Sequence, residues 1–265
     1  MVPLESLLDS TMRSVAEQAL SEILLPEDDV PDEAQYFQPY GDPSLRDRQV
    51  LLELISQLNA IGLIVFRISR LCFVRAFCVG KKDGMLRLLL DCRMPNLLCR
   101  SPPTTYLSTP ACFAGLRLGD SSLRRGFARS VELGLVASDC DREYRVSVGA
   151  VDLVDSFYLF AWDRLSALFA FDTPFYADEV GTTTALDDDG AEVEVGSDTL
   201  VFPCLGTLPM GWSWSLRFCH GVLCNVMLRA AILFGLPEDV ALGQFLVDGK
   251  PAPTIDSLRS EENLW

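Results

Sequence analysis

The feature that most constrains the fold is a turn sequence between two apolar runs near residue 80. Gly80-Lys81-Lys82-Asp83-Gly84 combines residue types that tight turns require, with a glycine at each end. The runs before and after it, residues 73–79 and 85–90, are predominantly apolar. We therefore predict a β-hairpin whose tip carries the two lysines.

Helix-like and strand-like patterns alternate along the rest of the chain. Apolar residues recur at helical spacing over 3–25, and again from Asp42-Pro43-Ser44 to about Asn59. This mixture predicts an α+β fold, in one large domain or two small ones. Further strands are predicted at 63–68, 144–153 and 199–205, further helices at 121–133, 155–169 and 213–234, and a long acidic hairpin or insertion at 172–198.

Charge is distributed unevenly, although the total is −15. Residues 1–45 carry one Arg and ten acidic residues, residues 46–145 carry sixteen Lys and Arg against nine acidic residues, and residues 146–265 carry five against eighteen. The total disfavours nucleic acid as a partner, but the basic middle third would attract phosphates. An unevenly charged solvated surface explains the same counts, so charge alone leaves both interpretations open.

Residues 26–43 form a Pro- and acid-rich stretch containing PEDDVPDE, which predicts a linker or mobile arm behind the first helix. The first residues lack the basic region and apolar stretch of a secretory signal. Apolar runs are interrupted by polar residues before they reach the roughly 18 residues that span a membrane. We expect a soluble, intracellular protein without a membrane partner, and the sequence does not distinguish nucleus from cytoplasm.

Three segments carry residues suited to phosphate or metal chemistry. In the first, Lys81 and Arg87 flank the predicted turn, where they could hold a triphosphate or simply form a solvated tip. In the second, an apolar strand ends in Asp152, followed by Asp155. Paired carboxylates suit a magnesium ion, although each Asp could also serve as a turn or helix-cap residue. In the third, the Pro209-Met210-Gly211 turn precedes an apolar helix, and its glycine lets the backbone approach a ligand closely.

The order of these segments resembles that of reverse transcriptases of retrotransposons and retroviruses. Here the order is KKDG with Arg87 and an Asp91-Cys92-Arg93 segment followed by Asn96, then DLVDSFY beginning at Asp152, then LPMGWSWS beginning at Leu208. The family has KKDGxxRxxxDYRxLN, then an aspartate motif before an aromatic residue, then LPQGWxxSP. The similarity extends from about Ala76 to Cys224, which is more than half of the chain.

The resemblance implies a partial right-hand polymerase, with fingers and an incomplete palm, preceded by an N-terminal helix on an acidic linker. The implied boundaries are 1–45 for the helix and linker, 46–145 for the fingers, 146–248 for the partial palm and 249–265 for an irregular tail. The implied activity is that of an RNA-directed DNA polymerase, a nucleotidyltransferase that uses two Mg²⁺ ions. The implied partners are a nucleic-acid template-primer and a deoxynucleotide.

Individual positions acquire roles through this resemblance. Lys81 and Arg87 would grip the triphosphate of the nucleotide. Asp152 would be the first catalytic, metal-binding aspartate. Phe157 would be the aromatic gate that excludes a ribose 2′-hydroxyl, which implies use of deoxynucleotides. Met210-Gly211 would lie near the nucleotide and template, although methionine replaces the usual glutamine and removes a polar contact.

The second metal-binding motif of the family, a YxDD hairpin, has no full counterpart in the 265 residues. The nearest segment is Phe245-Leu246-Val247-Asp248-Gly249, which makes Asp248 a candidate metal ligand, but Pro251 and Pro253 oppose a returning strand. We therefore expect a fragment of a mobile-element polymerase, truncated before that motif and inactive alone. Two alternatives stay open: a non-catalytic module that binds nucleic acid or protein, and an unrelated α/β protein with chance matches.

Overall fold

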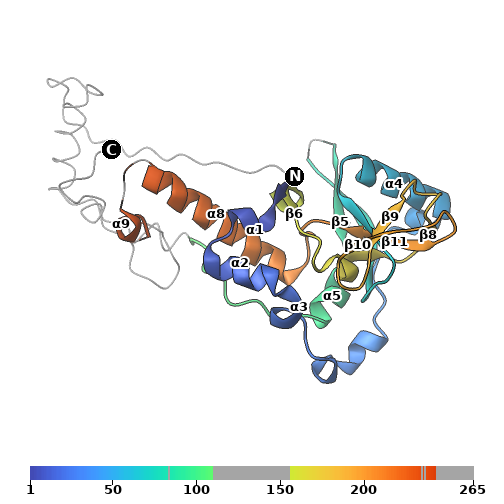
Figure 1. The fold of residues 1–265 in the computed structure, drawn as a ribbon, viewed down its shortest axis with the longest axis horizontal. Coiled ribbons are helices and arrows are strands. Elements are labelled where there is room, and N and C mark those ends of the chain that lie inside the picture. The colour runs from blue at the N-terminus through green and yellow to red at the C-terminus, as the bar shows by residue number, and fades with distance from the viewer. Residues whose placement is uncertain (83, 110–155, 234, 236, 243–265) are drawn as a thin grey trace. The chain divides into compact units, whose positions relative to one another are not determined.

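The computed structural model describes residues 1–82, 84–109, 156–233, 235 and 237–242. The chain forms two units, of which the first comprises Met1–Pro103 and Val154–Leu223, and the second comprises Thr104–Leu153 and Cys224–Trp265. Figure 1 shows helices and strands together in the first unit, so the predicted α+β class is confirmed at this coarse level. The helices and strands predicted at 121–133 and 144–153 lie outside the described residues.

The described elements are mostly short. The α-helices are α1 (Leu4–Leu7), α2 (Ser10–Glu17), α3 (Ala19–Glu22), α4 (Arg48–Ala60), α5 (Arg93–Leu97), α8 (Ser213–Leu233) and α9 (Glu238–Leu242). The 3-10 helices are η1 (Glu27–Asp29), η2 (Asp32–Gln35), η3 (Pro43–Arg46), η4 (Ser156–Leu159) and η5 (Ser166–Phe169). The strands are β1 (Val2–Pro3), β2 (Ile64–Arg67), β3 (Phe73–Val74), β4 (Ala76–Gly80), β5 (Leu86–Leu90), β6 (Phe160–Ala161), β7 (Ala170–Phe171), β8 (Phe175–Tyr176), β9 (Thr184–Leu186), β10 (Glu192–Glu194) and β11 (Leu200–Leu205).

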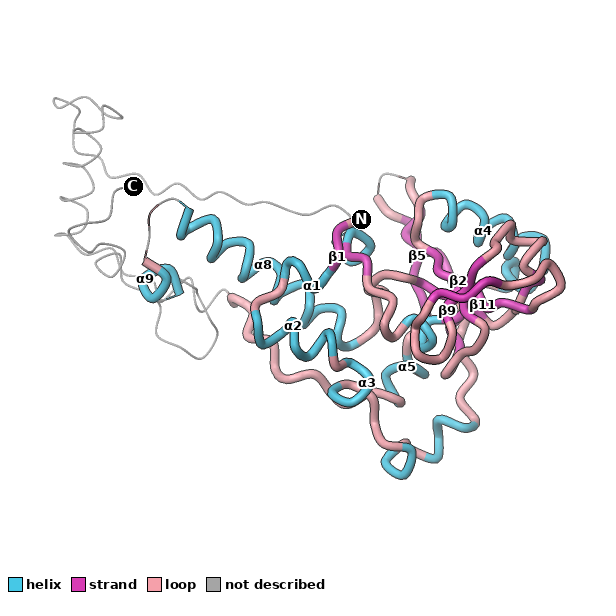
Figure 2. The backbone as a smooth tube through the Cα atoms, in the orientation of Figure 1, coloured by secondary structure: helices cyan, strands magenta, loops and turns pink. Residues whose placement is uncertain are grey.

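The largest sheet is organised around β11 (Figure 2). Six of its seven strands follow the order β10-β9-β2-β11-β7-β3, and the seventh, β8, pairs with β11 off this path. β11 runs antiparallel to β2, β7 and β8, whereas the β2–β9 and β3–β7 pairs are parallel. The predicted strands at 63–68 and 199–205 are confirmed as β2 and β11. Two smaller sheets hold the β1–β6 pair and the β4–β5 hairpin.

Aspartate caps set where the helices of the first unit begin. The Asp9 carboxylate accepts a hydrogen bond from the Met12 backbone N–H at 2.8 Å and caps α2. The Asp47 carboxylate accepts hydrogen bonds from the backbone N–H groups of Gln49 and Val50 and caps α4. The helix predicted to open at Asp42 therefore begins later, because Asp42 caps only the short 3-10 helix η3 and Asp47 supplies the second cap.

The core of the first unit is built from aromatic residues of distant segments. The Trp162 and Trp212 rings stack with their centroids 5.5 Å apart, and Phe218 lies 5.3 Å from Trp162. About one turn further along α8, a Cβ atom at Gly221 would lie 3.5 Å from Leu8 and 3.6 Å from Met12. The glycine thus gives the N-terminal helices α1 and α2 a close approach to α8.

The helix predicted at 155–169 is wrong over the described residues 156–169. This segment instead contains η4, β6 and η5. The side chains of Phe160, Trp162, Leu165, Leu168 and Phe169 are all buried, whereas Asp163 and Arg164 are exposed. Its backbone pairs with other segments, as Trp162 N–H donates to the Gly206 carbonyl at 2.8 Å and β6 pairs with β1.

The stretch at 26–43, predicted as a linker or mobile arm, is tied to the first unit (the light-blue segment between α3 and α4 in Figure 1). Leu25 N–H donates to the Leu98 carbonyl before the stretch, and Asp42 N–H donates to the Ala76 carbonyl near its end, both at 2.9 Å. Between these ties, Ala34 and Pro39 are buried. The prediction was wrong because prolines and acidic residues indicate a linker, whereas the buried Ala34 and Pro39 hold this stretch against the first unit.

Candidate nucleotide and nucleic-acid site

The predicted β-hairpin is present, and it positions the two cations assigned to the triphosphate. β4 and β5 pair antiparallel from Ala76↔Leu90 to Gly80↔Leu86, which places Arg87 opposite Val79. Lys81 N–H donates to the Met85 carbonyl at 2.7 Å, and Gly84 closes the turn with a φ of 81°. The Arg87 side chain is exposed, and within the described part of the chain its guanidinium makes no hydrogen bond or ion pair.

Two hydrogen bonds join the first predicted segment to the third. The Asn96 side-chain amide donates to the Gly211 carbonyl at 3.0 Å, and its oxygen accepts from the Ser213 backbone N–H at 2.9 Å. We call this pair of hydrogen bonds the Asn96–Gly211 clamp. Gly211 has a φ of 109°, and a Cβ atom there would lie 3.1 Å from the Leu90 carbonyl oxygen at the end of β5. The turn therefore requires glycine for two separate reasons.

The turn beside the clamp is reinforced from within. The Ser215 hydroxyl donates to the Pro209 carbonyl at 2.7 Å, and the Trp214 indole donates to the Arg100 carbonyl at the same distance. Both Trp212 and Trp214 are buried. Met210 is half-buried at the centre of the turn. Because the turn is held on both sides, the position of Met210-Gly211 relative to β5 is fixed.

Asp91, which follows β5 directly, carries a buried carboxylate with several donors. Arg93 donates to it through Nε at 2.9 Å and Nη2 at 2.6 Å, and the Tyr40 backbone N–H donates at 2.6 Å. Burial alone would raise the pKa of Asp91, but the hydrogen bonds from Arg93 and Tyr40 outweigh burial and hold the pKa below its usual range. Asp91 is therefore an ionised structural anchor.

The second predicted segment is described only from Ser156 onward. Phe157, in η4, is half-buried and packs against the core, and its neighbour Tyr158 donates a hydroxyl hydrogen bond to the Leu88 carbonyl of β5 at 3.0 Å. The segment after Asp152 thus lies beside the same strand that the Gly211 turn contacts. Parts of all three predicted segments are brought together around β5.

The predicted metal ligands Asp152 and Asp248 lie outside the described residues. Within the described part of the chain, His, Cys, Asp and Glu side chains form no group of three that could hold a metal ion. The expected Mg²⁺ site therefore stays a prediction attached to Asp152.

The buried thiols of Cys92, Cys99 and Cys204 are unsuited to nucleophilic chemistry. The Cys92 sulfur lies 4.0 Å from where a Gly211 Cβ would stand. Burial raises the pKa of Cys92, raises that of Cys99 to about 11 and raises that of Cys204 to about 12. At neutral pH these side chains are protonated packing groups.

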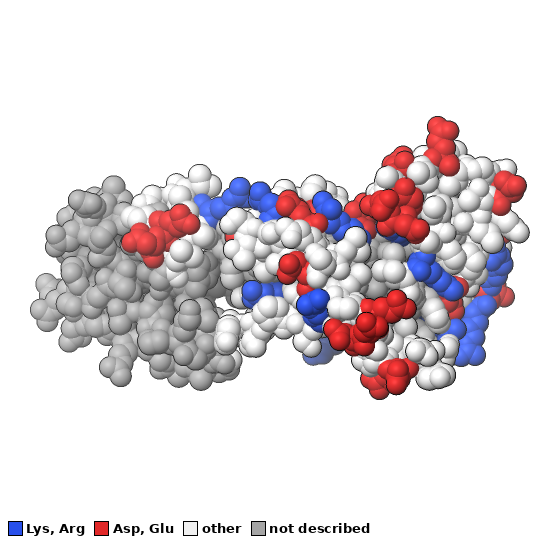
Figure 3. Space-filling view, turned by 60° about the horizontal axis from the view of Figure 1, so that its bottom comes forward, with Lys and Arg blue, Asp and Glu red and all other residues white. Residues whose placement is uncertain are grey.

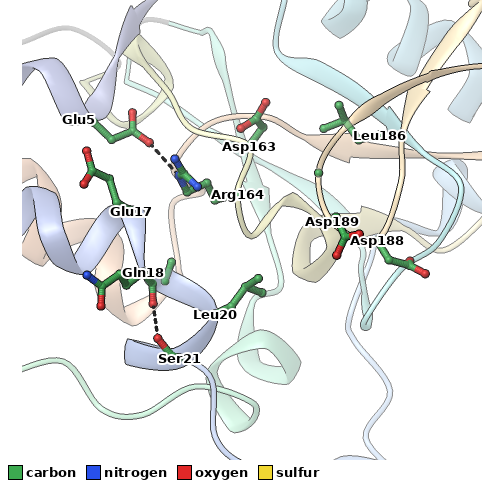
Figure 4. A pocket seen from close by; sticks show the side chains of 12 residues that line it. Glu5, Glu17, Gln18, Leu20, Ser21, Asp163, Arg164, Leu186, Asp188 and Asp189 are labelled. Carbon is green, nitrogen blue, oxygen red and sulfur yellow. Dashed lines mark hydrogen bonds and ion pairs between the residues drawn. The ribbon is translucent and has the colours of Figure 1, made fainter.

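A cavity among the described residues lies away from the predicted site residues. It has a volume of about 470 Å³ and opens between the N-terminal helices and the β9–β10 turn (Figure 4). Glu5, Glu17, Asp163, Asp188 and Asp189 face it, and Arg164 forms an ion pair with Glu5 at 3.6 Å. None of the predicted site residues lines this cavity, and its acidic character disfavours phosphate groups.

The face drawn in Figure 3 carries both acidic and basic side chains. Figure 3 shows acidic side chains gathered into several patches and Lys and Arg side chains in separate ones. The net charge of −15 is therefore a poor guide to any single face of the molecule.

Sequence reasoning assigned no role to Asn96, Tyr40 or the Asp91–Arg93 pair. Asp91 and Asn96 belong to the segment that resembles the family motif. The sequence therefore gives their positions, but it does not show which groups they contact. Tyr40 gave no sequence signal, because its backbone N–H is the group that contacts Asp91. Only the fold reveals such a contact.

No protein-family model matches this chain, and comparison with characterised proteins finds no significant match. One described helix, α8, is long and apolar enough to cross a membrane by length and composition alone. This is weak evidence, since core helices pass the same test; Trp214, Phe218 and Val222 of α8 are buried, but only 17% of its apolar window is buried.

Proposed function

We propose that this chain is a fragment of an RNA-directed DNA polymerase of the reverse-transcriptase kind, derived from a mobile element. In this proposal the β4–β5 hairpin binds the triphosphate of a deoxynucleotide, and the Gly211 turn lines the nucleotide's other side. The observation that carries the proposal is the Asn96–Gly211 clamp.

The clamp supports the proposal because it joins two segments that were selected from sequence for the same chemistry. Asn96 and Gly211 are separated by 115 positions, yet their polar groups meet at 3.0 Å. Tyr158 adds a contact from the remaining segment at a separation of 70 positions. Three chance matches in an unrelated fold would have no reason to converge on one strand.

The chemistry available at the hairpin fits a polyphosphate. An exposed guanidinium such as that of Arg87 offers a planar fork of donors, and lysine adds a point charge. Within this proposal, Phe157 limits the space beside the sugar and favours deoxynucleotides. Asp152 would supply the first carboxylate for Mg²⁺, which would stabilise charge on the transferred phosphoryl group.

The proposal includes inactivity of these 265 residues by themselves, because the sequence contains no complete YxDD motif beside Asp152. A two-metal site needs carboxylates from both segments. We therefore expect binding of nucleotide without primer extension. The competing function, a non-catalytic module that binds nucleic acid or protein, predicts no selective nucleotide binding at the hairpin.

The test is titration of the chain with radiolabelled dTTP in the presence of Mg²⁺, comparing the parent with Arg87→Ala. Loss of a charge-assisted contact should weaken dTTP binding by about tenfold or more. Arg229→Ala, which removes an exposed arginine on α8, is the matched control and should bind dTTP like the parent.

Selectivity completes the experiment. The parent should prefer dTTP over UTP, and Phe157→Ala should reduce that preference if the ring limits space beside the sugar. Absence of dTTP binding by the parent, or equal loss in Arg87→Ala and Arg229→Ala, would refute nucleotide binding at the hairpin. Template-dependent primer extension by the parent would overturn the expected inactivity and leave the polymerase class in place.

A further inference from the structure

The segment formed by residues 34–41, which we call the aromatic strap, has a firmly anchored backbone. Pro39 is buried, and its carbonyl accepts a hydrogen bond from Arg75 Nη1 at 3.2 Å. Tyr40 N–H donates to the buried Asp91 carboxylate at 2.6 Å. At Gly41 the strap approaches Arg75 so closely that a Cβ atom would lie 2.7 Å from the arginine side chain.

The strap nevertheless turns its aromatic rings outward. Tyr36 is 80% exposed and Tyr40 is 58% exposed, although both are flanked by anchored residues. The sequence AQYFQPYG over 34–41 contains no charged residue, in contrast to the acidic residues that precede it. Exposed rings on a fixed, uncharged backbone can contact a partner with little loss of conformational entropy.

The strap is continuous with a cation and with the hairpin. The Arg93 guanidinium lies 4.9 Å from the centre of the Phe37 ring, and the Arg93 side chain is 63% exposed. The Tyr40 ring meets Phe77 of β4 edge-on at 5.4 Å. Phe77 lies four residues before Lys81 on the strand that leads to the hairpin tip. Aromatic and cationic groups therefore form one connected surface from the strap to β4.

From this arrangement we infer that the aromatic strap is a stacking surface for the unpaired bases of a single-stranded nucleic acid. Bases of any sequence stack on aromatic rings, and a neighbouring guanidinium adds attraction for base faces and phosphates. Arg93 uses Nε and Nη2 on Asp91, and among the described residues Nη1 has no acceptor, so it can donate to a phosphate. The inference rests on the proposed function and extends its site beyond the recognised motifs to the N-terminal segment.

The experiment measures binding of fluorescein-labelled oligo(dT) of twenty nucleotides to the full chain by fluorescence anisotropy at about 50 mM salt. Tyr36→Ala/Tyr40→Ala should weaken binding by about tenfold or more, since both stacking faces are lost. Tyr36→Phe/Tyr40→Phe keeps the rings and should stay within about twofold of the parent. Tyr176→Ala, which removes an exposed tyrosine from β8, is the matched control and should bind like the parent.

Thermal unfolding of each variant identifies losses of oligonucleotide affinity that result from a destabilised fold. The inference fails if the parent does not bind the oligonucleotide, if the double alanine variant binds like Tyr176→Ala, or if the phenylalanine variant loses as much affinity as the alanine variant. Binding of a proline-rich peptide in place of the oligonucleotide would also overturn it. In each case the dTTP titration, which depends on Arg87, still reports separately on the proposed function.

Discussion

The Asn96–Gly211 clamp and the tip of the β4–β5 hairpin are both assigned to the same site, but they are built in opposite ways. The clamp joins two segments by hydrogen bonds, and its turn has an internal hydrogen bond and a glycine conformation that other residues strain to adopt. The hairpin tip projects exposed side chains, and a Cβ atom at Gly80 would meet nothing within 4 Å.

This contrast separates positioning from binding. A turn that sets the geometry of a site must resist displacement, and its residues contribute to stability as well as to function. A tip that carries charge to a ligand can be exposed, because its strength comes from charge and donor geometry. Substitutions in the clamp should therefore lower the free energy of unfolding, whereas substitutions at the tip should leave it nearly unchanged.

The largest effect is expected for Gly211→Ala. A φ of 109° is strained for alanine, and the new Cβ would press on the Leu90 carbonyl oxygen at 3.1 Å. We expect a loss of about 3 kcal/mol in the free energy of unfolding, measured by urea denaturation. Gly80→Ala at the tip is the control, with an expected change below about 0.5 kcal/mol. Equal effects at the two glycines would erase the distinction between the regions.

A smaller effect is expected for Asn96→Ala. The substitution removes both hydrogen bonds of the clamp and should lower the free energy of unfolding by about 1.5 kcal/mol, because the partners are partly reachable by water. Asn59→Ala on α4, where the side chain is exposed, serves as the control for loss of an asparagine. If Asn96→Ala and Asn59→Ala were equally stable, the hydrogen bonds of the clamp would not contribute to the stability of the fold.

The smallest effect concerns pH. The pKa of Asp91 is held below its usual range in the folded state, so its stabilising contribution is present above about pH 4 and is lost as the pH falls through the lowered value. The parent should therefore lose stability more steeply than Asp91→Asn when unfolding is followed from pH 6 to pH 2.5. Asp189→Asn, an exposed control in the β9–β10 turn, should follow the parent. Parallel curves for the parent and Asp91→Asn would contradict the assignment.

Local patterns in the sequence predicted local structure well. The β4–β5 hairpin, β2, β11 and the helix over Ser213–Leu233 all follow from turn residues and apolar spacing within a short window. The segment at 156–169 could not be predicted this way, because its strand partners lie at Val2–Pro3 and near Thr207. The linker predicted at 26–43 was wrong for a related reason, because Asp91 and Arg75, which lie far along the sequence, hold the aromatic strap in place.

The candidate site likewise contains residues that the local sequence identifies and contacts that only the fold shows. Arg87 and Gly211 could be selected from sequence, because residue type and turn context indicate what they can do. The clamp required the fold, because neither Asn96 nor Ser213 has a sequence neighbour that explains its hydrogen bonds. The roles of Asp152 and Asp248 stay predictions.

The pairing of β1 with β6 has a consequence for the order of events during synthesis. Val2–Pro3 is synthesised well before its parallel partner, Phe160–Ala161. At about 5–20 residues per second, the N-terminal strand waits roughly 10–30 s for that partner. During this interval Leu4, Leu8 and Met12, which the finished fold buries, have no core to enter. Residues 2–12 thus depend for their burial on residues 160–222, which are made much later.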